Sequence, residues 1–462
     1  MFSDFFSIFL IIFYLFLSLF IYLRKFYNLI YVVLICSSIV QIFDKPFFVQ
    51  VELSDVVGLS FIFFRFKDLK SILLRKSVLL YSVIFMLPIV VGSINVLFPF
   101  EFTSMNLFSR FEVFLKASLR VVGMLGSLYF LLYILSMKDF VLERLVRILL
   151  YSFLVSAITS LVVYSGLMSP YSFFKGASYT PNGGVSLYDF RLSGLCYEPR
   201  MLGYFSAFTY FLWDTLRTRK FLIFFLKIFS ILILVLTFSI SGMMFFLFLY
   251  ILNYLVINSI GAILKNIFTL TLFILAIGLI FYEHLVPIIE IFVKAIDQRF
   301  WIDKDFDFRF QYFPAFLSSL ERHDLPVIFY LDQNLSGIFL GFGYGLTRIF
   351  MGPYSWVSDF GGEGYNLQGT VTCCEAHVGF VYFLGVGGLV FLLLWLWLYA
   401  RSVYSISLYW GRMSGRLKSF FTLMLSGTFF MLFQIPQSSI VLVFYFVVFN
   451  SELILKRSLN EQ

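Results

Sequence analysis

The feature that most constrains the fold is a ladder of about a dozen long apolar segments, with Lys and Arg concentrated in alternate gaps between them. A helix that spans a bilayer needs about 20 predominantly apolar residues. A composition of 61% apolar and only 13% charged residues is typical of an all-α polytopic membrane protein. It excludes a soluble globular protein. Runs of this kind lie at about 5–23, 27–43, 78–98, 113–136, 148–166, 199–215, 221–238, 242–257, 266–282, 378–399, 419–435 and 438–454.

A shorter apolar segment at about 51–64 decides between twelve and thirteen spans, because hydropathy alone leaves it open. Counting it places the Lys/Arg-rich connections on one face, which the positive-inside rule makes cytoplasmic. Omitting it moves only the first two helices and leaves Arg24 and Lys25 outside, so we prefer thirteen. The formal net charge of +8 then reflects topology, and no nucleic-acid partner is expected. The Lys/Arg-rich connections are Arg24–Lys25, Arg65–Lys76, Lys138–Arg147, Arg217–Lys220, Lys265, Arg401–Lys418 and Lys456–Arg457.

The chain is expected to form a single integral-membrane domain over residues 1–462, with its extramembrane mass on the outer side. That mass comprises a smaller loop, 167–197, and a large loop, 283–377. The first apolar segment lacks a basic start and a small-residue cleavage site, so it is interpreted as an ordinary span. Long loops on membrane and soluble proteins often carry function.

The smaller loop ends in a group of charged residues just before an apolar segment. Proline is favoured at the first helical position, which predicts a helix that starts at Pro199, with Glu198 as its N-cap and Arg200 in its opening turn. Arg191 and Arg200 would then lie near the positive end of an outward-facing helix, which suits a phosphate-bearing ligand. The same positive charges favour the ionised form of Glu198. An ionised Glu198 suits the orientation of Arg191 or of a sugar hydroxyl better than it suits the role of a general base. The alternative is an N-cap beside arginines that reach phospholipid headgroups.

Spaced aspartates and glycines in the large loop invite metal and nucleotide interpretations that the spacing does not support. The aspartates at 303–307 lack the EF-hand glycine and final carboxylate, because Phe308 and Pro314 stand at those positions, so no metal is expected. The glycines at 341–345 lack the dinucleotide-binding pattern and its βαβ context. They predict a tight loop; a weaker alternative is that their backbone N–H groups approach a phosphate.

The best-placed histidine is His377, which immediately precedes the apolar segment 378–399 and should lie at the outer membrane surface. An imidazole there suits proton transfer or phosphate contact near neutral pH, whereas the alternative is a packing role at the interface. His284 and His323 are interpreted as solvated side chains. Cys196 with either Cys373 or Cys374 would form a disulfide if the Glu198 and His377 segments converge, and otherwise these thiols are free.

A transporter is the competing class, because ionisable residues inside spans can line a pathway. Lys116, Arg120 and Lys227 lie in apolar segments, but no clear carboxylate relay or inverted repeat accompanies them. Lys116 and Arg120 lie one helical turn apart, and they either line a cavity for a lipid diphosphate or pair with Glu112.

Four motifs, in this order along about residues 190–400, resemble the O-antigen polymerase/ligase superfamily. They are Arg191-Leu-Ser-Gly-(x)3-Glu198-Pro199-(x)2-Leu-Gly203, Leu236-Thr-Phe-Ser-Ile-Ser-Gly242, Arg309 followed by Gly341-Phe-Gly-Tyr-Gly345, and His377 with Gly385 and Gly388 downstream.

The resemblance implies a GT-C-like glycosyltransferase of the bacterial inner membrane that acts on undecaprenyl-diphosphate-linked glycans at the periplasmic face, without metal or cofactor. On this analogy Arg191 and Arg309, with Arg200 nearby, bind the diphosphate. His377, or Glu198 as second choice, accepts the proton of the acceptor hydroxyl. Membrane lipids and a chain-length regulator protein are the further partners that the resemblance suggests.

Two departures from the ligase pattern favour a polymerase of oligosaccharide repeat units. Val378 follows His377 where ligases commonly have Asn, and Glu198 precedes Pro199 where ligases tend to have Asn. An O-antigen ligase, which would transfer polysaccharide to lipid A core, remains the alternative within the family.

Overall fold

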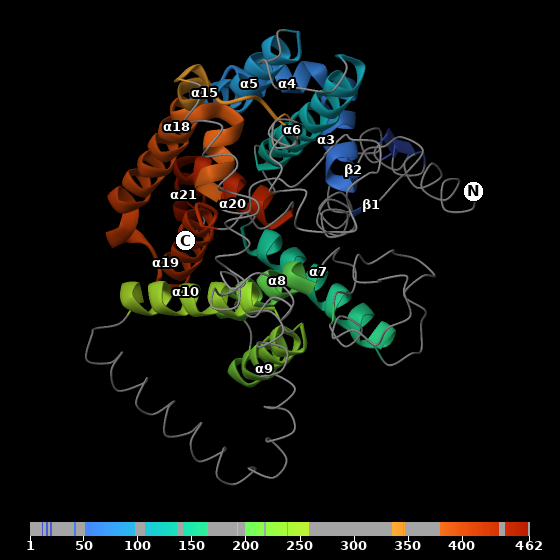
Figure 1. Ribbon diagram of the computed structural model, residues 1–462. Coiled ribbons are helices and arrows are strands. Elements are labelled where there is room, and N and C mark those ends of the chain that lie inside the picture. The colour runs from blue at the N-terminus through green and yellow to red at the C-terminus, as the bar shows by residue number, and fades with distance from the viewer. Residues whose placement is uncertain are drawn as a thin grey trace.

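The computed structural model shows an all-helical protein with one very short strand pairing (Figure 1). It describes residues 12, 15–16, 19–20, 41–42, 51–97, 107–135, 142–164, 192, 199–216, 219–237, 239–257, 335–344, 346, 379–433 and 439–460. The strands β1 (Gln41–Ile42) and β2 (Val51–Glu52) pair antiparallel. The helices are α3 (Leu53–Phe64), α4 (Phe66–Leu73), α5 (Lys76–Leu97), α6 (Leu107–Leu135), α7 (Leu142–Tyr164), α8 (Pro199–Leu212), η2 (Trp213–Thr215), α9 (Lys220–Leu236), α10 (Ile240–Ile257), α15 (Leu335–Leu340), α18 (Gly379–Tyr409), η4 (Trp410–Arg412), α19 (Gly415–Phe430), α20 (Ser439–Phe449) and α21 (Ser451–Asn460).

Four helical stretches in the described part of the chain are long and apolar enough to cross a membrane: Lys76–Leu97, Arg110–Leu135, Leu145–Val162 and Gly379–Arg412. They indicate a multi-pass membrane protein, as the sequence predicts. The total of twelve or thirteen spans stays a prediction, because several of the expected segments lie outside the described residues.

The short apolar segment at about 51–64, which hydropathy alone does not identify as a span, forms α3. Helix α3 packs tightly along α6. A Cβ added at Gly58 of α3 would overlap the backbone carbonyl of Gly123 of α6, so the two backbones touch. Farther along, the Arg65 guanidinium donates a hydrogen bond to the Tyr133 hydroxyl at 2.8 Å. The two helices therefore run in the same direction. With 12 residues, α3 rises about 18 Å, whereas the apolar core of a bilayer measures about 30 Å.

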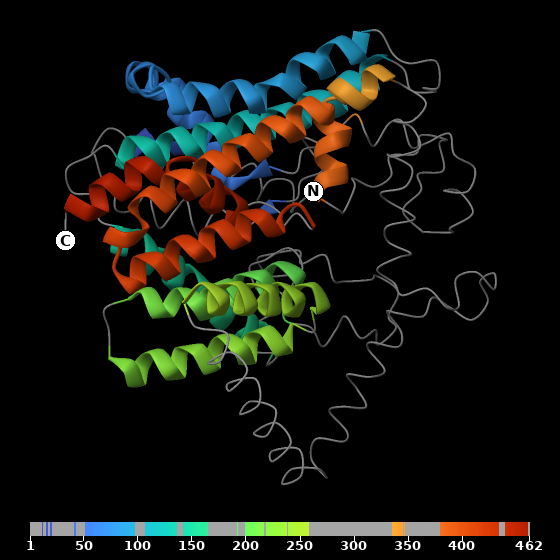
Figure 2. The same ribbon diagram turned by 90° about the vertical axis from the view of Figure 1, so that its left-hand side faces the viewer.

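Helices α5, α6 and α19 and the long arm of α18 share one long axis, and cationic connections gather at one end of it (Figure 2). In Figure 2, helices α5, α6, α18 and α19 run side by side, and the α4–α5, η2–α9 and α18–α19 connections lie at the same end. These connections carry Arg75 and Lys76, Arg219 and Lys220, and Arg412 to Lys418. This arrangement agrees with the predicted cytoplasmic face. The opposite end, where α8, α10 and α18 begin, is the predicted outer end.

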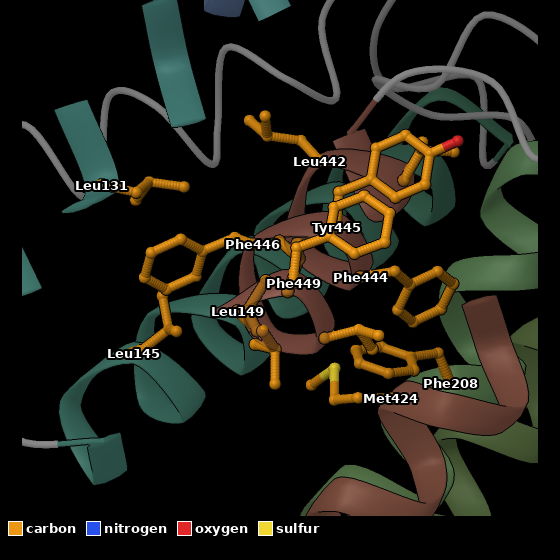
Figure 3. Packing of buried hydrophobic residues seen from close by; sticks show 14 of the residues in the cluster. Leu131, Leu145, Leu149, Phe208, Met424, Leu442, Phe444, Tyr445, Phe446 and Phe449 are labelled. Atoms are coloured by element: carbon orange, nitrogen blue, oxygen red, sulfur yellow. The ribbon is translucent and has the colours of Figure 1, made fainter. Parts of the chain in front are cut away.

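The core is rich in aromatic side chains and is centred on α20, whose residues from Val441 to Phe449 are all buried. A helix that is apolar on every side lies either among other helices or in lipid, and the burial of α20 shows that other helices surround it. Phe208 of α8 meets Phe444 edge-on, with ring centroids 5.3 Å apart (Figure 3). The ring centroid of Phe85 of α5 lies 5.2 Å from that of Tyr445. Helix α20 thus joins α5 and α8 in one hydrophobic core.

Candidate functional site

Two of the four motifs meet where α8 and α10 begin. The Leu192 N–H, in the Arg-Leu-Ser-Gly motif, donates to the Leu236 carbonyl at 3.1 Å. A Cβ added at Gly242 would lie 3.0 Å from the Cα of Gly203, so the second turn of α8 and the first turn of α10 pack backbone to backbone. The Ser239 hydroxyl caps α10 by accepting from the Gly242 N–H at 3.1 Å.

This contact brings two helix N-termini together at the predicted outer end. Each N-terminus carries a partial positive charge, because the first N–H groups have no acceptor within the helix. Arg200 lies in the opening turn of α8, and Leu192 follows Arg191 directly. The local field therefore suits an anion, which is the ligand type expected from the arginines.

The other two motifs also meet, through backbone hydrogen bonds. The N–H groups of Phe342 and Gly343 donate to the carbonyls of Gly385 and Val386 at 2.8 and 2.9 Å. Gly341 has a φ of +68° and ends α15, and a Cβ there would lie 2.5 Å from the nitrogen of Gly387. We name this set of pairings the glycine junction.

The glycine junction also includes α5 and a break in α18. Gly343, with a φ of +97°, lies so close to Gly92 of α5 that a Cβ would overlap the Gly92 backbone. Gly388 has a φ of +67° and interrupts α18. In Figure 2 the arm of α18 before this break lies across the long axis, and the arm after it runs along the bundle.

The tight loop predicted for the glycines at 341–345 is thus confirmed for its described part. The alternative, in which their N–H groups approach a phosphate, is wrong for Phe342 and Gly343, because both N–H groups are bonded to α18. These glycines serve close packing of backbone against backbone instead.

The end of α19 connects the start of α18 to the start of α8. The Phe380 N–H donates to the Leu432 carbonyl at 2.9 Å, and Gly379 packs directly on the Met431 backbone. One residue earlier, Phe430 meets Tyr204 of α8 with ring centroids 6.1 Å apart. Tyr204 lies one turn after Arg200, and Gly379 lies two residues after His377. We name this set of contacts the α19 link.

Most of the predicted site residues lie outside the described residues. The predicted helix start at Pro199 is confirmed, and with it the place of Arg200 in the opening turn, although its side chain is not described. Outside the described part of the chain lie Arg191, Glu198, Arg309 and His377, together with the aspartates at 303–307 and the three outer cysteines Cys196, Cys373 and Cys374. Their roles stay predictions.

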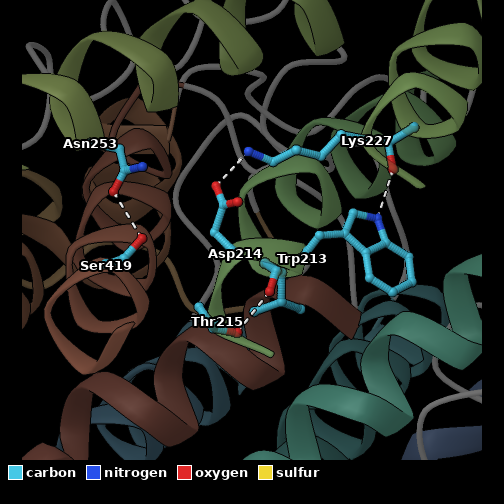
Figure 4. A network of polar contacts seen from close by, with 8 residues as sticks. Trp213, Asp214, Thr215, Lys227, Asn253 and Ser419 are labelled. Carbon is cyan, nitrogen blue, oxygen red and sulfur yellow. Dashed lines mark hydrogen bonds and ion pairs between the residues drawn. The ribbon is translucent and has the colours of Figure 1, made fainter. Parts of the chain in front are cut away.

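Two of the lysines expected in spans pair with carboxylates. Lys116 forms an ion pair with Glu112 one turn earlier in α6, which favours the pairing alternative over a cavity lining. The Lys227 ammonium of α9 lies 2.5 Å from a carboxylate oxygen of Asp214 (Figure 4). It also lies 4.6 Å from the ring centre of Tyr210. Each pair compensates the charge of its lysine, as expected for structural ion pairs near a bilayer.

The sequence interpretation overlooked Arg110, because it lies just outside the apolar run at 113–136. Its side chain is only 8% exposed, and its Nε and Nη1 atoms have no hydrogen-bond partner. The signal that could have revealed it is its helical spacing from Phe114, which places both residues on one face.

Among the described residues, no group of three or more His, Cys, Asp or Glu is arranged to hold a metal ion. Comparisons of the chain with known protein families, curated proteins and solved structures find no match. The function must therefore be inferred from the residues and contacts of the chain itself.

Proposed function

We propose that the chain is a GT-C-like glycosyltransferase of the bacterial inner membrane that polymerises undecaprenyl-diphosphate-linked repeat units at the periplasmic face. The observation that carries this proposal is the α19 link, which joins the helix that starts beside Arg200 to the helix that starts beside His377. The contact between Leu192 and Leu236 brings the Arg191 motif to the same helix starts. Three motifs that resemble the polymerase/ligase superfamily thus attach to one end of the bundle.

The chemistry follows from the residue types in those motifs. A diphosphate leaving group gains negative charge as the sugar–phosphate bond breaks, and fixed guanidinium groups stabilise that charge. Arg191 and Arg309 take this role in the proposal, with Arg200 at the helix start. The two helix N-termini at the α8–α10 contact add a favourable field.

The transfer step is an inverting displacement at the anomeric carbon. The acceptor hydroxyl, on the distal sugar of a second lipid-linked oligosaccharide, attacks from the face opposite the leaving group. The new glycosidic C–O bond forms as the bond to the diphosphate breaks, and the electron pair of that bond goes to the diphosphate. His377 accepts the hydroxyl proton, with Glu198 as second choice, and releases it to water.

Substitution of the arginine tests the proposal. Arg191→Lys keeps a positive charge but loses the two-pronged hydrogen bonding of the guanidinium, so we expect loss of long-chain polysaccharide at a normal protein level. The matched control is Arg147→Lys, because Arg147 is half exposed and pairs with Glu143 near the start of α7. Full-length glycan ladders from Arg191→Lys would remove Arg191 from the mechanism, and normal ladders from His377→Ala would do the same for His377.

Deletion of the gene separates the alternatives within the family. A single repeat unit on lipid A core in the deletion strain indicates a lost polymerase, and a bare core indicates a lost ligase. Unchanged surface polysaccharide would refute both.

A further inference from the structure

Arg110 lies at the predicted outer end of the membrane-spanning part of α6. The span Arg110–Leu135 begins with this residue. In Figure 2, α6 runs from the predicted outer end toward the cationic end of the bundle. Its guanidinium is therefore expected at the level of lipid headgroups, where a bilayer presents phosphate groups.

The side chain of Arg110 is buried, and no carboxylate in the described part of the chain pairs with it. It is 8% exposed, and neither Nε nor Nη1 has a hydrogen-bond partner. Glu112, two positions away, faces a different side of the helix and pairs with Lys116. A guanidinium carries a positive charge and five donors, and burying such a group without an anion is strongly unfavourable.

The surroundings of Arg110 are held in place by close packing. Phe114, one turn further along the same face of α6, packs against Gly92 of α5, where a Cβ would lie 2.5 Å from its ring and 3.2 Å from the Cα of Gly343. One turn after Gly92, the Asn95 side chain donates to the Phe342 carbonyl at 3.0 Å. Arg110 thus lies one turn outward from the glycine junction, on a frame that close packing fixes.

We propose that Arg110 is an anion-binding residue whose ligand is a phosphate oxyanion at the outer membrane surface. Helical side chains lean toward the N-terminus of their helix, so the guanidinium is directed to the first turn of α6, where the helix dipole also favours an anion. The planar fork of donors matches two oxygens of one phosphate. The inference goes beyond the proposed glycosyl transfer and does not depend on it, because Arg110 belongs to none of the four motifs.

The phosphate could come from a phospholipid, from a polyprenyl diphosphate or from free diphosphate, and one experiment distinguishes these sources. The full chain is purified in detergent, depleted of lipid, and unfolded thermally with phosphatidylglycerol, undecaprenyl diphosphate or inorganic diphosphate. We expect at least one probe to raise the melting temperature, and the probe that does so identifies the source.

Three variants make the test specific to the guanidinium. Arg110→Met removes the charge at similar length, so we expect it to abolish the shift while the protein without anion melts no lower than the unsubstituted chain. Arg110→Lys should weaken the binding about tenfold or more, because the fork is lost. Ser118→Ala is the control, since its hydroxyl lies on the same face, is buried and has no hydrogen-bond partner, so its loss should leave the shift intact.

The opposite pattern would overturn the proposal. If none of the probes shifts the melting temperature, or if Arg110→Met retains the full shift, Arg110 binds no phosphate. If Arg110→Met fails to fold, Arg110→Lys decides by the same criterion, and an unchanged affinity there refutes the role of the fork. Because melting requires no turnover, the result stands whether or not the chain polymerises glycans.

Discussion

A methyl group added at Gly341 should destabilise the whole outer end of the bundle. Gly341 has a φ of +68°, and a Cβ there would lie 2.5 Å from the nitrogen of Gly387 and 2.6 Å from that of Gly388. All of these atoms belong to the backbone and cannot rotate away. The left-handed conformation costs an L-residue about 1–2 kcal/mol. Moving the loop also weakens its two hydrogen bonds to α18, at about 0.5–1.5 kcal/mol each.

We therefore expect Gly341→Ala to lower the free energy of unfolding by about 2–5 kcal/mol. The measurement is reversible unfolding of the purified chain in mixed micelles. The control is Gly415→Ala at the start of α19, where nothing lies within 4 Å of an added Cβ. Alanine there should be neutral or stabilising by up to about 1 kcal/mol. Equal stabilities of the two variants would refute the close packing deduced for the glycine junction.

Three further expectations concern the rest of the bundle. Gly58→Ala should cost about 1–3 kcal/mol in the same assay, because its Cβ would overlap the Gly123 carbonyl and separate α3 from α6. Asp214→Asn should cost about 1 kcal/mol by leaving the Lys227 ammonium uncompensated, and the double variant with Lys227→Met should recover most of that loss; additive losses would contradict the pairing. A reporter fused after Lys25 should behave as cytoplasmic, and a periplasmic signal would favour twelve spans over thirteen.

Hydropathy predicts where the helices lie but not where they end. The apolar run at 113–136 becomes α6, yet the helix begins six residues earlier, at Leu107. The early turns contain Arg110, Glu112 and Lys116, which lower the hydropathy, although Glu112 and Lys116 neutralise each other across one turn. A hydropathy average takes no account of such ion pairs. It therefore misses Arg110, a charged residue that the helix buries.

Local chemistry predicts single turns, whereas the pairing of distant segments lies beyond it. Pro199 marks the start of α8, because its ring fits the first helical position. The same reasoning predicts a tight loop at Gly341–Gly345 but gives no sign that its N–H groups bond to α18. That partner lies more than forty residues further along the chain, at Gly385 and Val386. Only the folded backbone shows which glycines require close approach.

The break in α18 also determines how the protein can vary. The arm of α18 before Gly388 is held at one end by Met431 and near the other by Gly341, so it acts as a strut between two anchored points. Residues 347–378 connect Leu346, which lies beside one anchor, to Gly379, which lies beside the other. Insertions or deletions within that stretch do not alter the separation of its attachment points. The helical frame therefore fixes the separation of Leu346 and Gly379 independently of the length of the stretch between them.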